Sequence, residues 1–365
     1  TLDSMIISVI VNLTQGNSDR YQSTMKQGPS LKDIAKVAGV SINTVSRALN
    51  GKTLAKWPKI AERTERIRKI ARELGYRPHS AARAMRTQRS NHLAIIVSGA
   101  YQAPFEYPVV MAINKTLQQH GYSLSIISAA EIDLEHPEKT LAFRENFLAG
   151  LFLMHVPKPV RELVLDISPN IIHVDSNIRE ASNCIYRDEY AAGVIAARHA
   201  IDQRCGKILF LGHVPWSDDC HCHVELRRRG VQETAMAADV LCEIREIGFQ
   251  QEEYLQLGHE LPKLLSPRTM VITAGENLAF FVATAATKAG LIPGKHFGLI
   301  SCADTPQIQT IWPWLSRVHF PRFQLGRLAT EMMLQLLAGK KQIPSQTLEN
   351  PWIPGETAIL PSTGQ

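Results

Sequence analysis

The stretch LKDIAKVAGVSINTVSRALN (residues 31–50) decides the fold of the N-terminal part of this chain. Its apolar residues recur at helical spacing in two short segments, namely Leu31, Ile34, Ala35 and Ala38, then Val45, Ala48 and Leu49. Gly39 stands where the first helix would end, and Ser41 suits the N-cap of the second. Two short helices joined by a glycine-containing turn predict a helix-turn-helix.

A third helix is expected from about Glu65 to Leu74, where Gly75 provides a C-terminal stop. Its inward-facing residues are Ile67, Ile70, Ala71 and Leu74. The three helices predict an all-α helix-turn-helix domain over residues 29–76.

Charge is concentrated in the same region. The chain of 365 residues has a net charge of +6, but residues 25–90 alone hold 16 Lys and Arg against 4 Asp and Glu. A compact basic segment joined to a mildly acidic body is typical of a part that binds a polyanion such as nucleic acid. Charge alone fits a solvated basic surface equally well.

The second helix supplies the residues that would read DNA. A recognition helix lies in the major groove with its N-terminal residues at the base edges. The side chains placed there are Ser41, Ile42, Asn43, Thr44, Ser46, Arg47 and Asn50. Asn43 could pair with adenine, Arg47 with guanine, and Ile42 with a thymine methyl group. An ordinary helical hairpin with a polar face is the alternative interpretation.

From His92 onward, apolar runs alternate with helical stretches. Strands are expected at 93–98, 123–128, 151–156, 171–175, 207–212, 242–247, 270–275, 297–302 and 314–320. Helices are expected through Gln119, from 129 to about 147, and at 189–202, 225–237, 251–265, 277–289 and 322–338. This alternation predicts parallel sheets covered on both faces. Residues 92–365 are too many for one such sheet, so two similar doubly wound subdomains are expected.

The remaining features place the protein in the cytoplasm. The apolar run at residues 5–13 is shorter than the ~20 residues that span a bilayer. Residues 1–28 are expected to be a disordered extension or a start-site artefact. The six cysteines form no disulfide framework and are interpreted as reduced thiols.

We expect no metal site, no set of catalytic residues and no cofactor. The segment DDCHCH (218–223) has four potential ligands in a row, but adjacent side chains point in different directions and rarely converge on one ion. There is no nucleophile elbow, glycine-rich phosphate loop or HExxH helix. The sequence therefore favours a binding protein over an enzyme.

The segment AGVSINTVSRALN, followed by RKIARELGYRPHSAARAM, resembles the lac repressor/galactose repressor family of bacterial regulators. The resemblance covers residues 29–365 and is highly specific in the first 60 of these. It implies a homodimer in which each helix-turn-helix reads half of a near-palindromic operator. It also implies a sensor domain similar to sugar-binding periplasmic proteins, with an effector in the cleft between its subdomains.

The resemblance also makes residues 77–91 a hinge helix that forms on specific DNA, nucleated after Pro78. The family commonly has a leucine that wedges open the minor groove, and Met85 stands in its place. His79 stands where the family commonly has asparagine. The resemblance adds Leu31, His79, Ala82 and Met85 to the DNA-binding residues; a plain flexible linker is the alternative for Met85.

One departure from the family lies in GKTLAKWPKIAER (51–63), which is about five residues longer than the usual family loop. The insert could add phosphate contacts or touch a neighbouring subunit.

The resemblance also indicates effector-binding residues. Arg227 aligns with the family's effector-contacting arginine, Asp188 with an acidic residue near the cleft, and Glu276 with part of an asparagine–aspartate pair. In ISCADTP the family usually carries two aspartates, but here Ala303 precedes Asp304, which points to an unusual effector, a substitute contact or lost sensing. Tyr101, Phe105 and Trp216 follow strands and could stack on a sugar ring or simply pack.

Together these features favour a DNA-binding transcriptional regulator, a repressor by resemblance, whose operator affinity responds to a small effector such as a carbohydrate. The alternative from another class is a solute-binding receptor with no role on DNA.

Overall fold

The computed structural model describes residues 29–49, 58–76, 90–98, 103–136, 139, 148–165, 167–214 and 223–360. The chain divides into two compact units, Thr1–Arg83 and Ala84–Gln365, which are described separately below. The division falls inside the predicted hinge at 77–91, of which residues 77–89 lie outside the described part of the chain.

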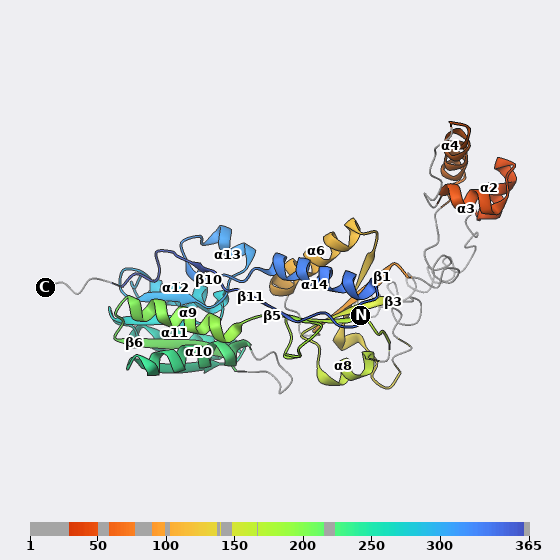
Figure 1. Cartoon of the computed structure of the whole chain (residues 1–365). Coiled ribbons are helices and arrows are strands. Elements are labelled where there is room, and N and C mark those ends of the chain that lie inside the picture. Colours follow the sequence, from red (N-terminus) through yellow and green to blue (C-terminus); the bar gives the residue numbers. More distant parts are fainter. Residues whose placement is uncertain are drawn as a thin grey trace, which may run out of the picture. The chain divides into compact units, whose positions relative to one another are not determined.

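The smaller unit contains helices α2 (Leu31–Ala38), α3 (Ile42–Leu49) and α4 (Pro58–Glu73) (Figure 1). Ser30 and Asp33 form a capping box at the start of α2, and Gly39 ends it with a φ of 68°. The Thr44 N–H donates to Ser41 Oγ at 3.2 Å, so Ser41 caps α3 as expected. A small core joins the three helices: Ile34, Ala35, Ala38, Val45, Ala48, Ile67 and Ala71. These helices form the predicted helix-turn-helix.

Helix α4 is longer than the sequence pattern predicted. It begins at Pro58, seven residues before the expected start at Glu65, and ends at Glu73. The expected start was wrong because it was based on the first apolar residue that packs inward. Proline at the first position of a helix is favoured, and the residues after it are good helix formers. Residues 58–63 of the segment 51–63 are therefore helix, and residues 51–57 lie outside the described part of the chain.

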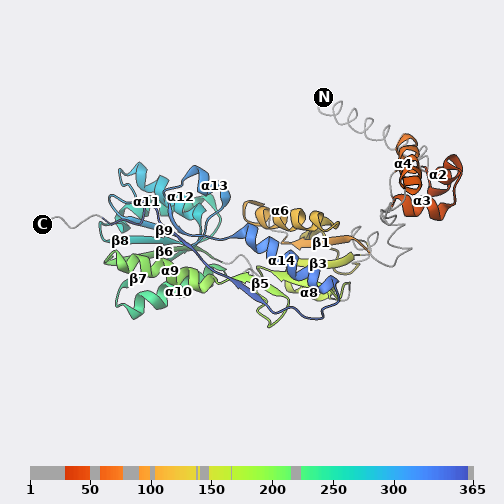
Figure 2. The same cartoon turned by 45° about the horizontal axis from the view of Figure 1, so that its top comes forward.

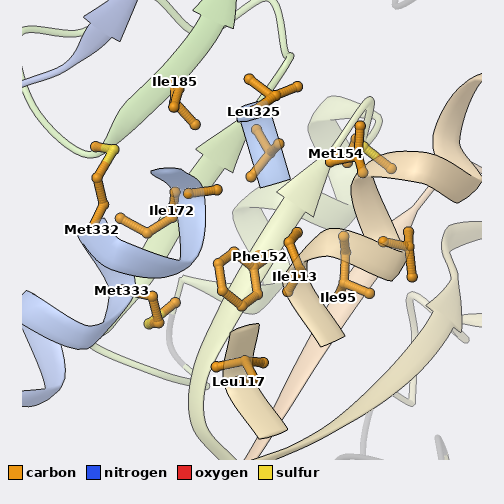
Figure 3. Close-up of a cluster of buried hydrophobic side chains, with 14 of the residues drawn as sticks. Ile95, Ile113, Leu117, Phe152, Met154, Ile172, Ile185, Leu325, Met332 and Met333 are labelled. Atoms are coloured by element: carbon orange, nitrogen blue, oxygen red, sulfur yellow. The ribbon is translucent and has the colours of Figure 1, made fainter. Parts of the chain in front are cut away.

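The first sheet of the larger unit has six parallel strands in the order β2 (Ser123–Ser128), β1 (His92–Val97), β3 (Leu148–Met154), β4 (Ile171–Val174), β5 (Cys184–Arg187) and β11 (Gln346–Leu348). Alternate residues of each strand face opposite sides. Leu93 and Ile95 pack with helices α6 (Ala103–Gln119) and α14 (Arg322–Leu337). Figure 3 shows Ile95 and Phe152 in this cluster. Ala94 and Ile96 pack with α8 (Lys158–Val164) and the 3₁₀ turn η1 (Ala129–Glu131) on the other face.

The second sheet also has six strands, in the order β7 (Leu241–Ile247), β6 (Lys207–His213), β8 (Thr269–Thr273), β9 (Gly298–Ser301), β10 (Ser316–Val318) and β12 (Trp352–Ile353). All pairs are parallel except β10 with β12. One face is covered by α9 (Glu189–Asp202) and α10 (His223–Ala237), the other by α11 (Gln251–Leu264), α12 (Glu276–Lys288) and α13 (Pro306–Ile311) (Figure 2). The predicted pair of doubly wound subdomains is confirmed.

Five short elements of two to seven residues each were missed by the sequence pattern: β5, β11, β12, α8 and α13. The expected helix at 129–147 is not formed by the described residues 129–136, which make only a 3₁₀ turn; residues 140–147 lie outside the description. Strand β3 begins at Leu148, three residues earlier than expected, because Gly150 continues the strand.

The chain passes between the two sheets in three places, between β5 and α9, between β10 and α14, and between β11 and β12. Hydrogen bonds of side chains and of the backbone join these passages to one another. The Asn350 amide of the third passage accepts from Arg187 Nε at 2.6 Å and donates to the Asp188 carbonyl of the first at 2.6 Å. The backbone N–H of His319 in the second passage donates to the Pro351 carbonyl of the third at 2.7 Å.

Two glycines bring α9 and α10 into close contact. A methyl group at Gly193 would overlap the carbonyl oxygen of Arg227, and one at Gly230 would overlap the carbonyl oxygen of Tyr190. Because backbone atoms cannot move aside as a flexible side chain can, only glycine fits at this crossing. The crossing seats Arg227 of α10 against the first turn of α9.

We expect Gly193→Ala to lower the free energy of unfolding by about 1–3 kcal/mol or more, because the methyl group forces the helices apart. Gly258→Ala is the matched control. Gly258 also lies in a helix, but a methyl group there would meet Phe281 at an ordinary 3.6 Å, so this change should be neutral or slightly stabilising. Urea denaturation measures both; equal effects of the two variants would contradict the close-packing argument.

Among the residues that the structure describes, no helix is long and apolar enough to cross a membrane.

Candidate functional sites

The first candidate site is the outer face of α3. Ser41, Ile42, Asn43 and Arg47 are exposed, and Thr44 and Ser46 are half-buried beside them. Val45 and Ala48 point the opposite way, into the small core. The structure thus brings together six of the predicted base-reading side chains on one helix face. Leu31 is half-buried and packs against the core. Asn50, His79, Ala82 and Met85 lie outside the described residues.

The second candidate site is built at the carboxyl ends of the strands in the larger unit, where ligands of open α/β sheets bind. Arg227, predicted from the sequence, is buried here with its guanidinium inside the protein. Its Nε donates to Glu189 Oε2 at 2.7 Å and its Nη1 donates to the carbonyl of Ala274, which follows β8. Burial lowers the pKa of Arg227, but the Glu189 carboxylate outweighs this and raises the pKa.

Glu189 is shared with a second buried arginine that the sequence interpretation missed. Arg187, the last residue of β5, is fully buried and its Nη1 lies 3.2 Å from Glu189 Oε2. Its Nη2 donates to the carbonyl of Cys302, after β9 of the second sheet, at 2.6 Å. Burial lowers the pKa of Arg187 to about 10, so it stays charged at neutral pH. Burial raises the pKa of Glu189, but both arginines outweigh this and lower it.

Two of the other predicted acidic residues, Asp188 and Glu276, differ in their contacts within the protein. Asp188 caps α9, accepting from the Ala191 N–H at 2.9 Å. Glu276, buried at the start of α12, has one oxygen, Oε2, that receives no hydrogen bond from any described residue.

Asp304 is fully buried after β9. It accepts from Arg317 Nε at 2.9 Å and from the Phe320 N–H at 3.0 Å, and lies 3.0 Å from His319 Nδ1. Arg322 donates to its backbone carbonyl. Burial raises the pKa of the Asp304 carboxyl, but these donors outweigh it and hold the pKa below its usual value. With Ala303 beside it, Asp304 holds the passage from β10 to α14 in place.

Tyr101 and Trp216 lie outside the described residues, as does most of the DDCHCH segment. The backbone of Phe105 belongs to the first turn of α6.

A buried cluster of three titratable groups was also missed. His155 follows β3, Asp175 follows β4, and Glu106 lies in the first turn of α6. His155 Nδ1 is 3.4 Å from Glu106 Oε1, and His155 Nε2 is 3.4 Å from Asp175 Oδ2. Burial lowers the pKa of His155, but the two carboxylates outweigh it and raise the pKa to about 9. The imidazole is therefore a cation at neutral pH.

The clusters form one electrostatic network. The charge of Asp175 raises the pKa of both Glu189 and Arg227. The network contains five carboxylates (Glu106, Asp175, Glu189, Glu276 and Asp304) and five cations (His155, Arg187, Arg227, Arg317 and Arg322). The formal charge of these ten described side chains is thus balanced. A sequence rule that collects polar residues directly after buried strands would have found His155 and Asp175.

Comparisons with known proteins agree with this arrangement. The model of bacterial regulatory proteins of the lacI family matches residues 30–79, and that of the periplasmic binding protein-like domain matches residues 197–358. The transcriptional regulator GntR of Pseudomonas aeruginosa is 27% identical over 325 residues, covering 86% of this chain and 90% of that protein. The regulator GalS of Salmonella typhimurium is 27% identical, covering 86% and 92%.

Solved structures share the fold. A lac repressor dimer bound to operator and an anti-inducer has a TM-score of 0.75 at 20% identity, covering 91% of this chain and 100% of that one. A complex of the regulator CelR with cellobiose has a TM-score of 0.61 at 20% identity, covering 90% and 99%. The two matched models together span more than half of the sequence, in the order that the two structural units follow. The chain thus joins a helix-turn-helix domain of the lacI family of bacterial regulatory proteins to a periplasmic binding protein-like domain.

Proposed function

We propose that this protein is a transcriptional repressor that binds a near-palindromic operator as a homodimer and responds to a small effector. The observation that carries the proposal is the pairing of a helix-turn-helix whose α3 presents polar side chains outward with a larger unit whose buried polar groups join two sheets. Relatives named as repressors, such as PurR of Serratia proteamaculans at 25% identity, support this direction of control. A cytoplasmic location follows from action on DNA.

The effector we propose is uncharged and rich in hydroxyl groups, as carbohydrates are. The network at the strand ends is balanced, so a ligand with a net charge would add an uncompensated buried charge, which is costly. Glu189 Oε1 and Glu276 Oε2 receive no hydrogen bond from described residues. Hydroxyl groups can donate to such acceptors. Arg227, Glu276, Tyr101, Phe105 and Trp216 are the residues proposed to lie around the effector.

The proposed coupling runs through the passages between the sheets. Arg187, Asn350 and Asp304 connect these passages to the strand ends where the effector would bind. We propose that the effector changes the angle between the two sheets, and that this change alters the conformation of the hinge at 77–91. His79, Ala82 and Met85 of this hinge are proposed to reach the minor groove. A coupling free energy of about 1–3 kcal/mol is enough for regulation.

Selection of genomic fragments by the full-length protein at about physiological salt tests the function. Enrichment of one near-palindromic site, released or tightened by a neutral sugar, is the expected result. Salt-sensitive binding without any enriched site, in the presence and absence of sugars and purines, would contradict it and favour a solute-binding receptor.

Arg47→Ala tests the reading surface. Arg47 is exposed on α3, where a bidentate contact to guanine discriminates by about 1–3 kcal/mol. We expect this variant to lose about 5- to 150-fold in affinity for each half-site that the homodimer contacts, and to lose preference at one base pair per half-site. Arg72→Ala, on a different helix and paired with Glu65, is the control. A uniform loss over all sequences would show that Arg47 contacts phosphate and reads no base.

A further inference from the structure

The first turns of α4 are not held by the core of the smaller unit. Every residue from Pro58 to Arg63 is exposed, and Thr64 is the first buried side chain of the helix. The core contacts of α4 come later, from Ile67 and Ala71. The early turns therefore contribute little buried area, and packing does not explain their presence.

Three cations on this helix have no partner among the described residues. Lys59, Arg63 and Arg66 are exposed, and no ion pair or hydrogen bond of their side chains is formed within the described part of the chain. Their spacing of four and three residues places them on one face of the helix. We call these three residues the basic stripe.

The other cations of α4 are compensated. Arg72 lies 3.0 Å and Arg68 3.7 Å from Glu65, and Lys69 lies 4.0 Å from Glu73. All of these groups are exposed, so exposure alone does not explain the difference. The helix pairs the cations beside the basic stripe with carboxylates and leaves those of the stripe without an ion pair in the described part of the chain. With exposed Glu62, which follows Lys59 by three residues, this end of the helix keeps a net charge of +2.

The charge and length of the basic stripe fit the DNA backbone. From Lys59 to Arg66 the helix rises ~10 Å. One DNA strand carries a phosphate charge every ~3.4 Å along the axis, so the stripe has about the length of three phosphates. It belongs to the same compact unit as the exposed face of α3, and α4 packs directly on the two helices of the helix-turn-helix.

We propose that Lys59, Arg63 and Arg66 bind DNA phosphates beside the site read by α3, and so extend the protein–DNA contact without adding sequence preference. The inference rests on the proposed function, because it requires the smaller unit to lie on DNA. Phosphate contacts fix position and supply affinity, whereas base contacts supply specificity.

The test compares two triple variants of the full-length protein. Lys59→Gln, Arg63→Gln and Arg66→Gln together remove the basic stripe. Arg68→Gln, Lys69→Gln and Arg72→Gln together make the same change in net charge on the same helix but remove cations that are already paired. Affinity for the enriched operator and for a random duplex is measured from low to physiological salt. Circular dichroism checks that both variants keep their helices.

We expect the stripe variant to flatten the plot of log affinity against log salt by about 0.9 for each lost contact. Operator and random duplex should lose affinity by the same factor, and the paired-cation variant should change the slope much less. Equal slopes for the two variants would overturn the inference, as would a stripe variant that associates less with itself while its DNA slope is unchanged. If the wild-type protein enriches no site, the proposed function fails instead, which is a separate result.

Discussion

Glu189→Gln is expected to lower the free energy of unfolding of the larger unit by about 3–5 kcal/mol, because it removes the charge shared by two buried arginines. Glu189 is 1% exposed and Arg187 0%, so water cannot replace the lost carboxylate. Glutamine keeps the size of the side chain, which limits the effect to charge and hydrogen bonding. Urea denaturation followed by far-UV circular dichroism measures the change.

Glu331→Gln is the matched control for this variant. Glu331 pairs with Arg327 one helical turn away, at 2.6 Å, but both side chains are about half exposed. An exposed pair of this kind contributes about 0.3–0.5 kcal/mol. If Glu189→Gln were as mild as Glu331→Gln, the buried network would not be charged as described.

A double variant separates charge from packing. Glu189→Gln with Arg187→Met removes one cation together with the anion and restores the formal balance of the network. Part of the lost stability should return, because an uncompensated buried charge costs more than the absence of a pair. Because the two residues are in contact, their effects should not be additive. Strict additivity would mean that Arg187 and Glu189 do not interact.

The sequence alone predicted the helix-turn-helix and both α/β subdomains because their signals are local. The apolar spacing around Ile34 and Val45, with Gly39 between them, specifies two helices and the turn. Long buried strands such as β6 and β8 are visible as apolar runs. Strands β11 and β12 are not visible, because two or three residues carry no periodicity and gain their pairing only from the assembled sheets.

The candidate site was predicted less completely because its contacts join distant segments. Arg227 was found through a family motif, but its partner Glu189 lies 38 residues earlier and is brought close by the glycine crossing of α9 and α10. Arg187 donates a hydrogen bond to Asn350, which lies 163 residues away in the sequence. Such charged side chains look like solvated surface in a single sequence. Their burial in the folded protein shows that these side chains form ion pairs and hydrogen bonds with one another.

The second large effect is a dependence of stability on pH through His155. The pKa of His155 rises from an ordinary 6.5 to about 9 in the folded protein, because Glu106 and Asp175 outweigh its burial. A group whose pKa is raised by folding stabilises the protein fully below the unfolded value, and this stabilisation disappears as the pH rises through the folded value. We expect a loss of up to about 3 kcal/mol between pH 6.5 and 9, at 1.36 kcal/mol for each unit.

The difference between the wild-type protein and His155→Gln isolates this group. Burial raises the pKa of the thiols of Cys184, Cys205 and Cys302, so they also reduce stability at alkaline pH, but they do so in both proteins and cancel in the difference. Burial lowers the pKa of His173 and His213, whose effects therefore lie below pH 6.5 and outside the window.

His155→Gln should therefore be less stable than the wild-type protein at pH 6.5, since Glu106 and Asp175 lose the cation between them, and the gap should narrow toward pH 9. His259→Gln, at an exposed position of α11, should follow the wild-type curve throughout. A constant gap for His155→Gln would mean that the imidazole is neutral in the folded protein. Glu106 and Asp175 would then need another cation, and the proposal of an uncharged effector would lose its basis, because the network at the strand ends would carry a net negative charge.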